Sequence, residues 1–242
     1  TGVSGAIGSA IASKFGASGA RVAGTFRSNL AEAKQALESI PEDRRAVFQA
    51  ELDSPAAARA LWDEAEAWHP LDTLVLNAAM MAPTRVFDED DSEWDEGWEE
   101  VFRVNVHASA ALMREATKDF AERGQGTVIV ISSWAAEQGS RIPEASAYAA
   151  SKSALRNLAQ TLARATARKG VRFYTIAPGV VDGGMGTSGL TEREIRDVAE
   201  GLVMGKHVRI DEIAELTAFL ATDRCPNLTG STIDLNGASY VR

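Results

Sequence analysis

The sequence has almost no cysteine, no long apolar run and no excess of positive charge. Cys225 is the single cysteine in 242 residues, which excludes an internal disulfide and favours a reducing compartment. No run approaches the roughly 18–20 apolar residues that span a bilayer. The net charge of −9 disfavours nonspecific binding to nucleic acid. We therefore expect a cytoplasmic protein that binds neither membrane nor nucleic acid.

The sequence also lacks a strand where its first motif needs one. Residues 1–8, TGVSGAIG, have the pattern of a glycine-rich turn that binds a pyrophosphate between a buried strand and a helix. Gly2 permits a tight turn, Gly5 leaves room beside the pyrophosphate, and Gly8 lets the helix pack close to the sheet. Without a central strand, the neighbouring strands would leave main-chain groups unpaired, at about 1–3 kcal/mol each. We expect about 6–12 further residues before Thr1, forming an apolar strand.

Apolar, β-branched segments alternate along the chain with amphipathic segments. The expected strands are residues 20–26, 45–52, 71–79, 126–133, 171–179 and 231–237, and the expected helices are residues 8–15, 29–40, 55–68, 94–123, 147–168 and 212–222. This order predicts an α/β fold, a single doubly wound and mostly parallel sheet with helices on both faces. We expect one domain over residues 1–242, with a substrate lid at residues 182–209.

Tyr148 and Lys152 form the motif YAASK in one expected helix. A spacing of four places both side chains on the same helix face. An ammonium beside a phenol favours the phenolate, so we expect Lys152 to lower the pKa of Tyr148 toward the working pH. Such a tyrosine can donate a proton to a carbonyl oxygen or accept one from an alcohol. The same spacing also occurs on exposed helices, where it carries no chemistry.

Ser132 and Ser133 follow the most strand-like segment of the chain. Ligands of open α/β sheets bind at the carboxyl ends of the strands, where a hydroxyl can hydrogen-bond a substrate oxygen. The alternative is that these serines only end the strand or cap a helix.

Together these motifs resemble those of the short-chain dehydrogenase/reductase family, over essentially the whole chain. The segments that carry the resemblance are TGVSGAIG (1–8), LNAA (76–79), NVHASAAL (105–112), VISS (130–133), YAASK (148–152), APGVV (177–181) and LTGSTIDLNGASYV (228–241). The resemblance implies a Rossmann-type fold and an oxidoreductase that exchanges a hydride between a nicotinamide cofactor and its substrate.

The resemblance also implies roles for individual residues. Tyr148 is the catalytic acid or base, Lys152 lowers its pKa and binds the nicotinamide ribose, and Ser133 holds the substrate oxygen. Asn105 supports a water that relays protons through Lys152. The other implied cofactor-binding residues are Gly2, Ser4, Gly5, Ile7, Gly8, Arg27, Ser28, Glu51, Leu52, Asn77, Ala78, Pro178, Gly179 and Val181. No metal site is implied.

The chain departs from the usual family pattern in several places. Ser133 and Tyr148 are fifteen positions apart, slightly more than is usual, so we expect a short insertion at the mouth of the pocket. Gly183 stands where a threonine often binds the carboxamide, which leaves that role to the backbone of Val181. In the glycine turn, Ser4 stands where many NADP-dependent members carry a basic residue.

The strand expected at residues 20–26 ends without an acidic residue. An acid there would bind the ribose 2′-hydroxyl and repel a 2′-phosphate. Arg27 and Ser28 instead offer a charge-assisted phosphate site. We therefore expect NADP rather than NAD, with Glu51 and Leu52 beside the adenine.

The substrate is the least specified part of the site. The residues expected around it are Met80, Met81, Trp134, Ile142 and Met185, which favour an apolar or mixed carbonyl compound. The resemblance is closest to reductases of 3-oxoacyl thioesters, so Arg123, Arg168 and Lys169 are candidates for docking an acidic acyl carrier. The alternatives are a dehydrogenase of a small secondary alcohol, sugar or steroid-like ring, and a non-catalytic nucleotide-binding regulator. We expect a homotetramer, because similar family members pair through their long helices and last strand.

Overall fold

The computed structural model describes residues 1–87 and 90–241 of the chain. In this part the strands are β1 (Val22–Phe26), β2 (Arg45–Gln49), β3 (Thr73–Leu76), β4 (Gly126–Ile131), β5 (Val171–Pro178) and β6 (Thr232–Leu235). The α-helices are α1 (Ala6–Ala17), α2 (Leu30–Ala36), α3 (Pro55–Trp68), α4 (Asp91–Phe102), α5 (Ser109–Arg123), α6 (Ala135–Gln138), α7 (Ser146–Thr166), α8 (Glu192–Glu200) and α9 (Ile210–Leu220). Each strand lies inside a segment in which the sequence predicts a strand.

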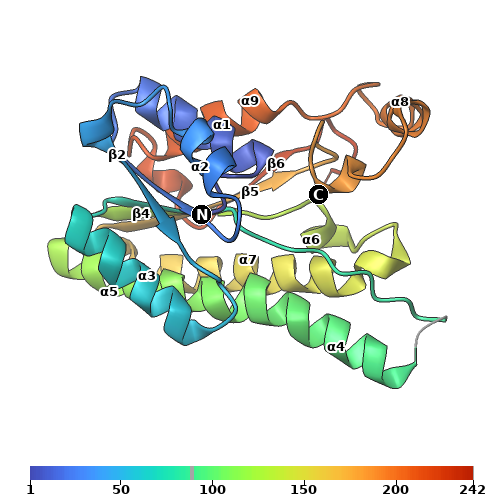
Figure 1. Cartoon of the computed structure of the whole chain (residues 1–242), viewed down its shortest axis with the longest axis horizontal. Helices are drawn as coiled ribbons and strands as arrows, with labels where there is room; N and C mark the ends of the chain where they lie inside the picture. The colour runs from blue at the N-terminus through green and yellow to red at the C-terminus, as the bar shows by residue number, and fades with distance from the viewer. Residues whose placement is uncertain (88–89, 242) are drawn as a thin grey trace.

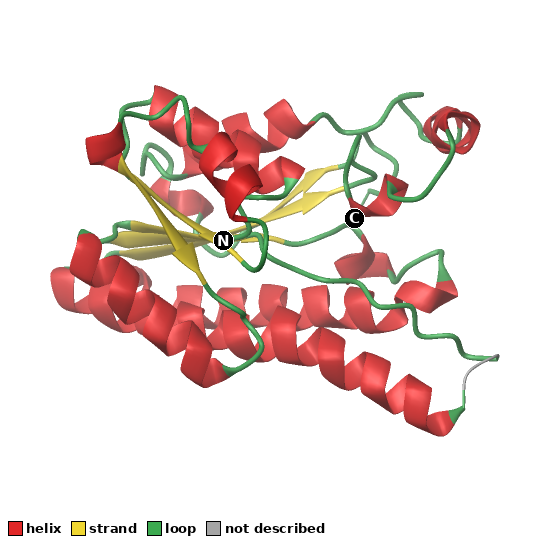
Figure 2. Cartoon of the chain, viewed as in Figure 1, coloured by secondary structure: helices red, strands yellow, loops and turns green. Residues whose placement is uncertain are grey.

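The strands form a layer between two layers of helices (Figure 2). In Figure 1, α3, α4, α5 and α7 lie below the strands, while α1, α2 and α9 lie above them. All strand pairs are parallel, which confirms the predicted α/β class. Among the described residues, no helix combines the length and apolar character needed to cross a bilayer.

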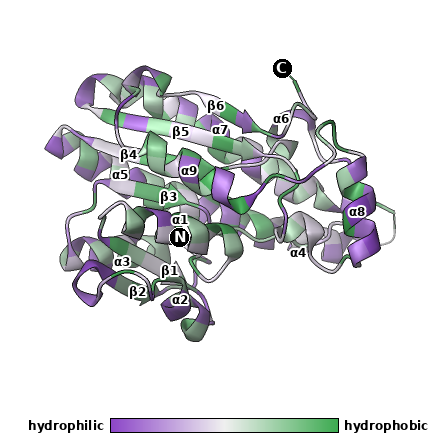
Figure 3. Ribbon diagram, turned by 90° about the horizontal axis from the view of Figure 1, so that it is seen from above, coloured by the Kyte–Doolittle hydropathy of each residue, from purple (hydrophilic) through white to green (hydrophobic). Residues whose placement is uncertain are grey.

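Hydrogen bonding divides the strand layer into two groups, β1-β2 and β3-β4-β5-β6, where the sequence predicts one continuous sheet. Viewed from above, β2 and β6 lie toward opposite edges of the molecule (Figure 3). A cleft of about 420 Å³ lies between the groups, lined by Val22 and Ala23 of β1 and by Leu74 and Val75 of β3. At the carboxyl ends of the strands, residues 1–3 bridge the two groups. A strand before Thr1 stays a prediction, and none of the expected catalytic residues lines this cleft.

β4 shows why the strands are apolar along their whole length. Val128 and Val130 pack into the core against α3, α5 and α7, whereas Ile129 and Ile131 pack into the core against α1 and α9. All four side chains are buried, so β4 is covered on both faces, as is typical of parallel sheets. Its carboxyl end therefore lies between the helix layers, and Ser133 follows it there.

Local signals in the sequence set several helix boundaries. The Ser54 hydroxyl accepts a hydrogen bond from the Ala57 N–H (3.2 Å), and Pro55 occupies the first turn of α3, which confirms the predicted start. The Thr191 and Glu194 capping box begins α8. This helix lies within residues 182–209, the segment expected as an irregular lid.

Two expected helices differ from the structure. The helix expected at residues 29–40 ends at Ala36, and the buried Leu37 and Ile40 continue as turns that pack into the core. The helix expected at residues 94–123 is interrupted by a π-helical segment, η2 (Arg103–Ala108). The π-segment contains Asn105, whose buried side chain bonds to groups outside the helix, and π-segments are frequent at functional sites.

Candidate active site

The glycine-rich turn leads into α1 with the geometry of a phosphate site. Gly2 has a φ of +72°, a region that favours glycine. A Cβ atom at Gly8 would lie 2.2 Å from the Gly2 carbonyl oxygen, so a side chain there would displace the turn. Gly5 is the N-cap of α1 and contributes no side-chain cap to the first N–H groups of the helix. These N–H groups and the positive end of the helix dipole fit the pyrophosphate of a dinucleotide.

Asn77 and Ala78 hold the glycine turn in place. The Asn77 Nδ2 donates to the Thr1 carbonyl (2.9 Å), and the main-chain N–H groups of Asn77 and Ala78 donate to the Thr1 hydroxyl (3.0 and 2.9 Å). Both residues were expected to bind the cofactor. Their described contacts fix Thr1 at the start of the turn, and direct binding of the cofactor by them stays a prediction.

The remaining turn residues and the adenosine end of the expected site lie on the surface or at its edge. Ser4 is half-buried, and the Ile7 side chain packs against the core next to α9. Arg27 and Ser28 directly follow β1 and are exposed, and Gln49 Nε2 donates to the Arg27 carbonyl (3.0 Å). Two further predicted residues follow β2: Glu51 is exposed, and Leu52 packs at the margin of the core.

The fold brings Ser133, Tyr148 and Lys152 together at the carboxyl end of β4. The Ser133 side chain lies close enough to the Tyr148 phenol to counter part of the rise in its pKa. The Lys152 Nζ lies 5.6 Å from the centre of the Tyr148 ring and donates to the Ile131 carbonyl (2.8 Å). Ser133 and Lys152 are buried, and Tyr148 is half-buried. The arrangement presents two hydroxyl groups, the Tyr148 phenol and the Ser133 side chain, that can both hydrogen-bond one substrate oxygen. The buried Lys152 ammonium lies beside the Tyr148 ring.

Loss of water around Tyr148 and Lys152 decides their pKa values. Burial raises the pKa of Tyr148 to about 12, and the nearby Ser133 side chain opposes this only in part. Burial also lowers the pKa of Lys152 to about 8. The expectation that Lys152 lowers the pKa of Tyr148 below its ordinary value is therefore wrong for this structure. The phenol keeps its proton at neutral pH, which suits a proton donor.

Asn105 lies in η2, and its side-chain amide makes three hydrogen bonds. Oδ1 accepts from the Met80 N–H (2.8 Å), while Nδ2 donates to the Met80 carbonyl (2.9 Å) and to Ser151 Oγ (3.0 Å). Ser151, in turn, donates to the Tyr148 carbonyl (2.7 Å). The predicted role of Asn105 in supporting a water stays a prediction. Ser151 was missed by sequence reasoning, although it lies inside the YAASK motif, one position before the lysine.

The segment after β5 is tied to the last strand and to the lid. The Gly179 N–H donates to the Leu235 carbonyl (2.9 Å), and a Cβ at Gly179 would lie 3.1 Å from Asn236, so Pro178 and Gly179 lie against the strand β6 and its end. The Val181 carbonyl accepts from the Gly184 N–H (3.1 Å) and from Thr187 Oγ1 (3.4 Å). The predicted contact of the Val181 backbone with the carboxamide stays a prediction. Thr187 is buried. The sequence analysis does not single it out, because it considers only position 183, where a threonine often stands.

The expected substrate residues all lie in segments that follow the carboxyl ends of strands. Met80 follows β3 and is held by Asn105, and Trp134 follows β4, with the Arg141 guanidinium 5.9 Å from its ring centre. The more exposed members of the set are Met81, Ile142 and Met185, whose exposed fractions are 40%, 57% and 43%. These residues place apolar side chains in loops at the same end of the sheet as Ser133.

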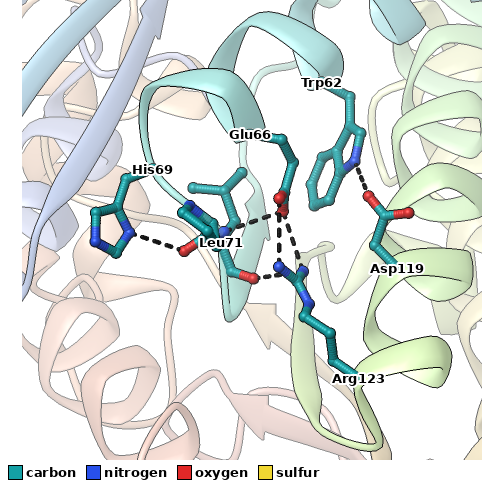
Figure 4. A network of polar contacts seen from close by, with 7 residues as sticks. Trp62, Glu66, His69, Leu71, Asp119 and Arg123 are labelled. Carbon is teal, nitrogen blue, oxygen red and sulfur yellow. Dashed lines mark hydrogen bonds and ion pairs between the residues drawn. The ribbon is translucent and has the colours of Figure 1, made fainter.

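Arg123, one of the residues predicted to dock an acyl carrier, makes contacts within the chain. Its guanidinium forms an ion pair with Glu66 (3.1 Å) and donates to the Leu71 carbonyl (2.7 Å), as Figure 4 shows. Arg123, Arg168 and Lys169 also directly precede the amino ends of β4 and β5. Within one protomer they lie at the opposite end of these strands from Ser133, roughly 20 Å away for a six-residue strand.

Several known proteins are similar to this chain over nearly its full length. Residues 2–237 match the family described as Enoyl-(Acyl carrier protein) reductase. The 3-oxoacyl-(acyl-carrier-protein) reductase FabG of Rickettsia conorii is 30% identical over 100% of this chain and 95% of that protein. The 3beta-hydroxysteroid dehydrogenase 1 of Eggerthella lenta is 31% identical over 98% of this chain and 90% of that protein. A crystal structure provisionally described as a betaketoacyl-ACP reductase is 32% identical, with a TM-score of 0.83 over 98% of this chain and 94% of that one.

Proposed function

The chain belongs to the short-chain dehydrogenase/reductase family, and from that premise we propose that it reduces the 3-oxo group of an acyl thioester with NADPH. It is an NAD(P)-dependent oxidoreductase that interconverts a ketone and a secondary alcohol. The observation that carries the proposal is the convergence of Ser133, Tyr148 and the Lys152 ammonium at the carboxyl end of β4. This set supplies a proton donor and an oxygen-binding hydroxyl at one point.

Tyr148 donates its phenolic proton to the substrate oxygen, which its raised pKa permits at neutral pH. Ser133 hydrogen-bonds the same oxygen and orients it. Lys152 keeps positive charge beside the ring as negative charge develops on the phenol oxygen. The nicotinamide, when bound, supplies the hydride. The glycine turn, held by Asn77, would bind the phosphates of the dinucleotide.

NADP is the proposed cofactor because Arg27 and Ser28 are exposed at the end of β1, where no acidic residue repels a 2′-phosphate. The guanidinium can pair with the phosphate in a bidentate manner. Glu51 and Leu52, after β2, are proposed to flank the adenine. The proposed carboxamide contacts are Pro178, Gly179 and the N–H of Val181.

A 3-oxoacyl thioester is favoured as substrate by the similarity to the Rickettsia conorii reductase, and Met80, Trp134, Ile142 and Met185 offer apolar side chains for its acyl group. The second candidate is a steroid-like or other cyclic secondary alcohol, which the similarity to the Eggerthella lenta dehydrogenase favours. An acyl carrier is a proposed partner, although Arg123 is engaged elsewhere. We further propose one domain over residues 1–242, a substrate lid at residues 182–209, a homotetramer and a cytoplasmic location.

Turnover of matched substrates tests the proposal. With NADPH, acetoacetyl-CoA should be reduced with a higher kcat/KM than a simple ketone or a 3-oxosteroid. A preference for the steroid would select the second candidate. NADPH binding without turnover of any carbonyl compound would leave only a nucleotide-binding regulator. Sedimentation at micromolar concentration tests the tetramer.

A further inference from the structure

Thr84 connects two loops that border the proposed active site. It lies in the segment between β3 and α4, and its side chain is fully buried. Its N–H donates to the Glu144 carbonyl (2.8 Å), and its hydroxyl donates to the same carbonyl (3.1 Å). The hydroxyl also lies 2.8 Å from the Ser146 hydroxyl. Ser146 is the first residue of α7, two positions before Tyr148.

The two branches of the Thr84 side chain have separate partners. A threonine hydroxyl carries one proton and two acceptor sites, so donation to Glu144 leaves it to accept from Ser146. The methyl group faces α4, where a Cβ added at Gly97 would lie 3.1 Å from Thr84 Cγ2. Both the shape and the hydroxyl of threonine are therefore used at this position.

The N-terminus of α7 has no side-chain cap of its own. Its N-cap residue, Ala145, makes no side-chain cap, and residues 141–144 before it are exposed. On the other side, the loop that contains Thr84 is held at Met80 by Asn105. The Thr84 hydroxyl therefore joins a fixed loop to the helix turn that carries Tyr148.

We propose that Thr84 is a positioning residue, which keeps the Tyr148 phenol beside the Ser133 side chain by fixing the first turn of α7. The inference rests on the proposed catalytic role of Tyr148. A displacement of about 1 Å at a reacting group can lower a rate about 10²-fold, so a bond that holds this turn affects the chemical step. The cofactor turn at Gly2 and Gly8 is held by other contacts and does not depend on it.

Paired variants separate the hydroxyl from the shape of the side chain. Thr84→Val keeps the branched shape and removes the hydroxyl, whereas Thr84→Ser keeps the hydroxyl. With acetoacetyl-CoA and NADPH, kcat of Thr84→Val should fall about 10- to 100-fold, with the Kd for NADPH unchanged within about twofold. Thr84→Ser should restore most of kcat. Hydrogen exchange of the amides of residues 146–149 should rise in Thr84→Val.

Thr217→Val is the matched control. Thr217 is also fully buried, and its hydroxyl donates to the Ile213 carbonyl (2.7 Å) within α9. This variant should lose stability but keep kcat. Equal losses of kcat in Thr84→Val and Thr217→Val would overturn the proposal, since they would reflect stability alone.

Two further results complete the test. If Thr84→Val does not fold, Ser146→Ala removes the same bond from the half-buried partner, and an unchanged kcat there would overturn the proposal. Full activity of Tyr148→Phe would contradict the proposed function itself. An inactive Tyr148→Phe beside a fully active Thr84→Val would refute only the role of Thr84.

Discussion

Asn105 binds both main-chain polar atoms of Met80, accepting from its N–H at 2.8 Å and donating to its carbonyl at 2.9 Å. The contact joins a π-helical turn to the loop that follows β3. It also places Asn105 against Ser151, and through Ser151 against the carbonyl of Tyr148. The proposed catalytic tyrosine is thus supported from a helix that is distant in sequence.

Asn105→Ala should destabilise the fold, because it removes two hydrogen bonds to the half-buried Met80 main chain and one to the buried Ser151 hydroxyl, at about 1–3 kcal/mol for each group left buried without a partner. We expect the free energy of unfolding to fall by about 2–5 kcal/mol in urea titrations. The control is Asn157→Ala, an exposed position on α7, which should change stability by less than about 0.5 kcal/mol. Similar losses in both variants would contradict the role of the Asn105 side chain.

Tyr148→Phe should lower the rate of carbonyl reduction by roughly 10²–10⁴-fold, because it removes the proton donor. The Kd for NADPH, measured by fluorescence titration, should change little. Tyr174→Phe is the control, since Tyr174 is buried in β5 and is given no catalytic role. Activity of Tyr148→Phe within a factor of two of the parent would rule out the mechanism.

Because of Lys152, the free energy of unfolding should change with pH in the alkaline range. The pKa of Lys152 is lowered from 10.5 to about 8 in the folded protein, so between these values the unfolded chain binds more protons. Stability from this group therefore rises with pH across that window, by about 3 kcal/mol in total. Unfolding of the parent and of Lys152→Met should be compared at pH 8 and pH 10. If the difference in the free energy of unfolding between the parent and Lys152→Met is the same at both pH values, the lowered pKa of Lys152 is contradicted.

Arg27→Asp should weaken NADPH far more than NADH, because an attraction to the 2′-phosphate becomes a repulsion. A charge-assisted hydrogen bond contributes about 1.5–3 kcal/mol, so the NADPH/NADH ratio of kcat/KM should fall roughly 10- to 100-fold. Arg21→Asp makes the same charge change beside the other end of β1 and should leave the ratio unchanged. An unaltered ratio in Arg27→Asp would show that Arg27 does not contact the phosphate.

Gly8→Ala should disrupt the phosphate turn, since the new Cβ would lie 2.2 Å from a main-chain oxygen of Gly2. We expect the Kd for NADPH to rise at least about tenfold, as measured by calorimetry. Gly201→Ala is the control, because Gly201 has a φ of −75° and its nearest neighbour would be 3.4 Å from the new atom. If Gly8→Ala binds NADPH as tightly as the parent does, the phosphates do not bind at the glycine turn.

The spacing of apolar and polar residues over short stretches of the sequence determined the positions of most helices and strands. The two-sided apolar character of β4, the Ser54 and Pro55 start of α3, and the four-residue spacing of Tyr148 and Lys152 each depend on residues that are neighbours in the chain. Helix and strand periodicities translate such spacing directly into faces and boundaries. The fold class was therefore predictable from the sequence.

Only the tertiary structure decided the contacts between distant segments and the direction of the pKa shifts. The hydrogen bonds from Asn105 to Met80 and Ser151, and from Thr84 to Glu144, join residues 25 to 60 positions apart. No short-range pattern encodes them, because they depend on how whole elements pack. The pKa of Tyr148 rises although Lys152 lies beside it, since the loss of water around a buried group depends on every segment that covers it.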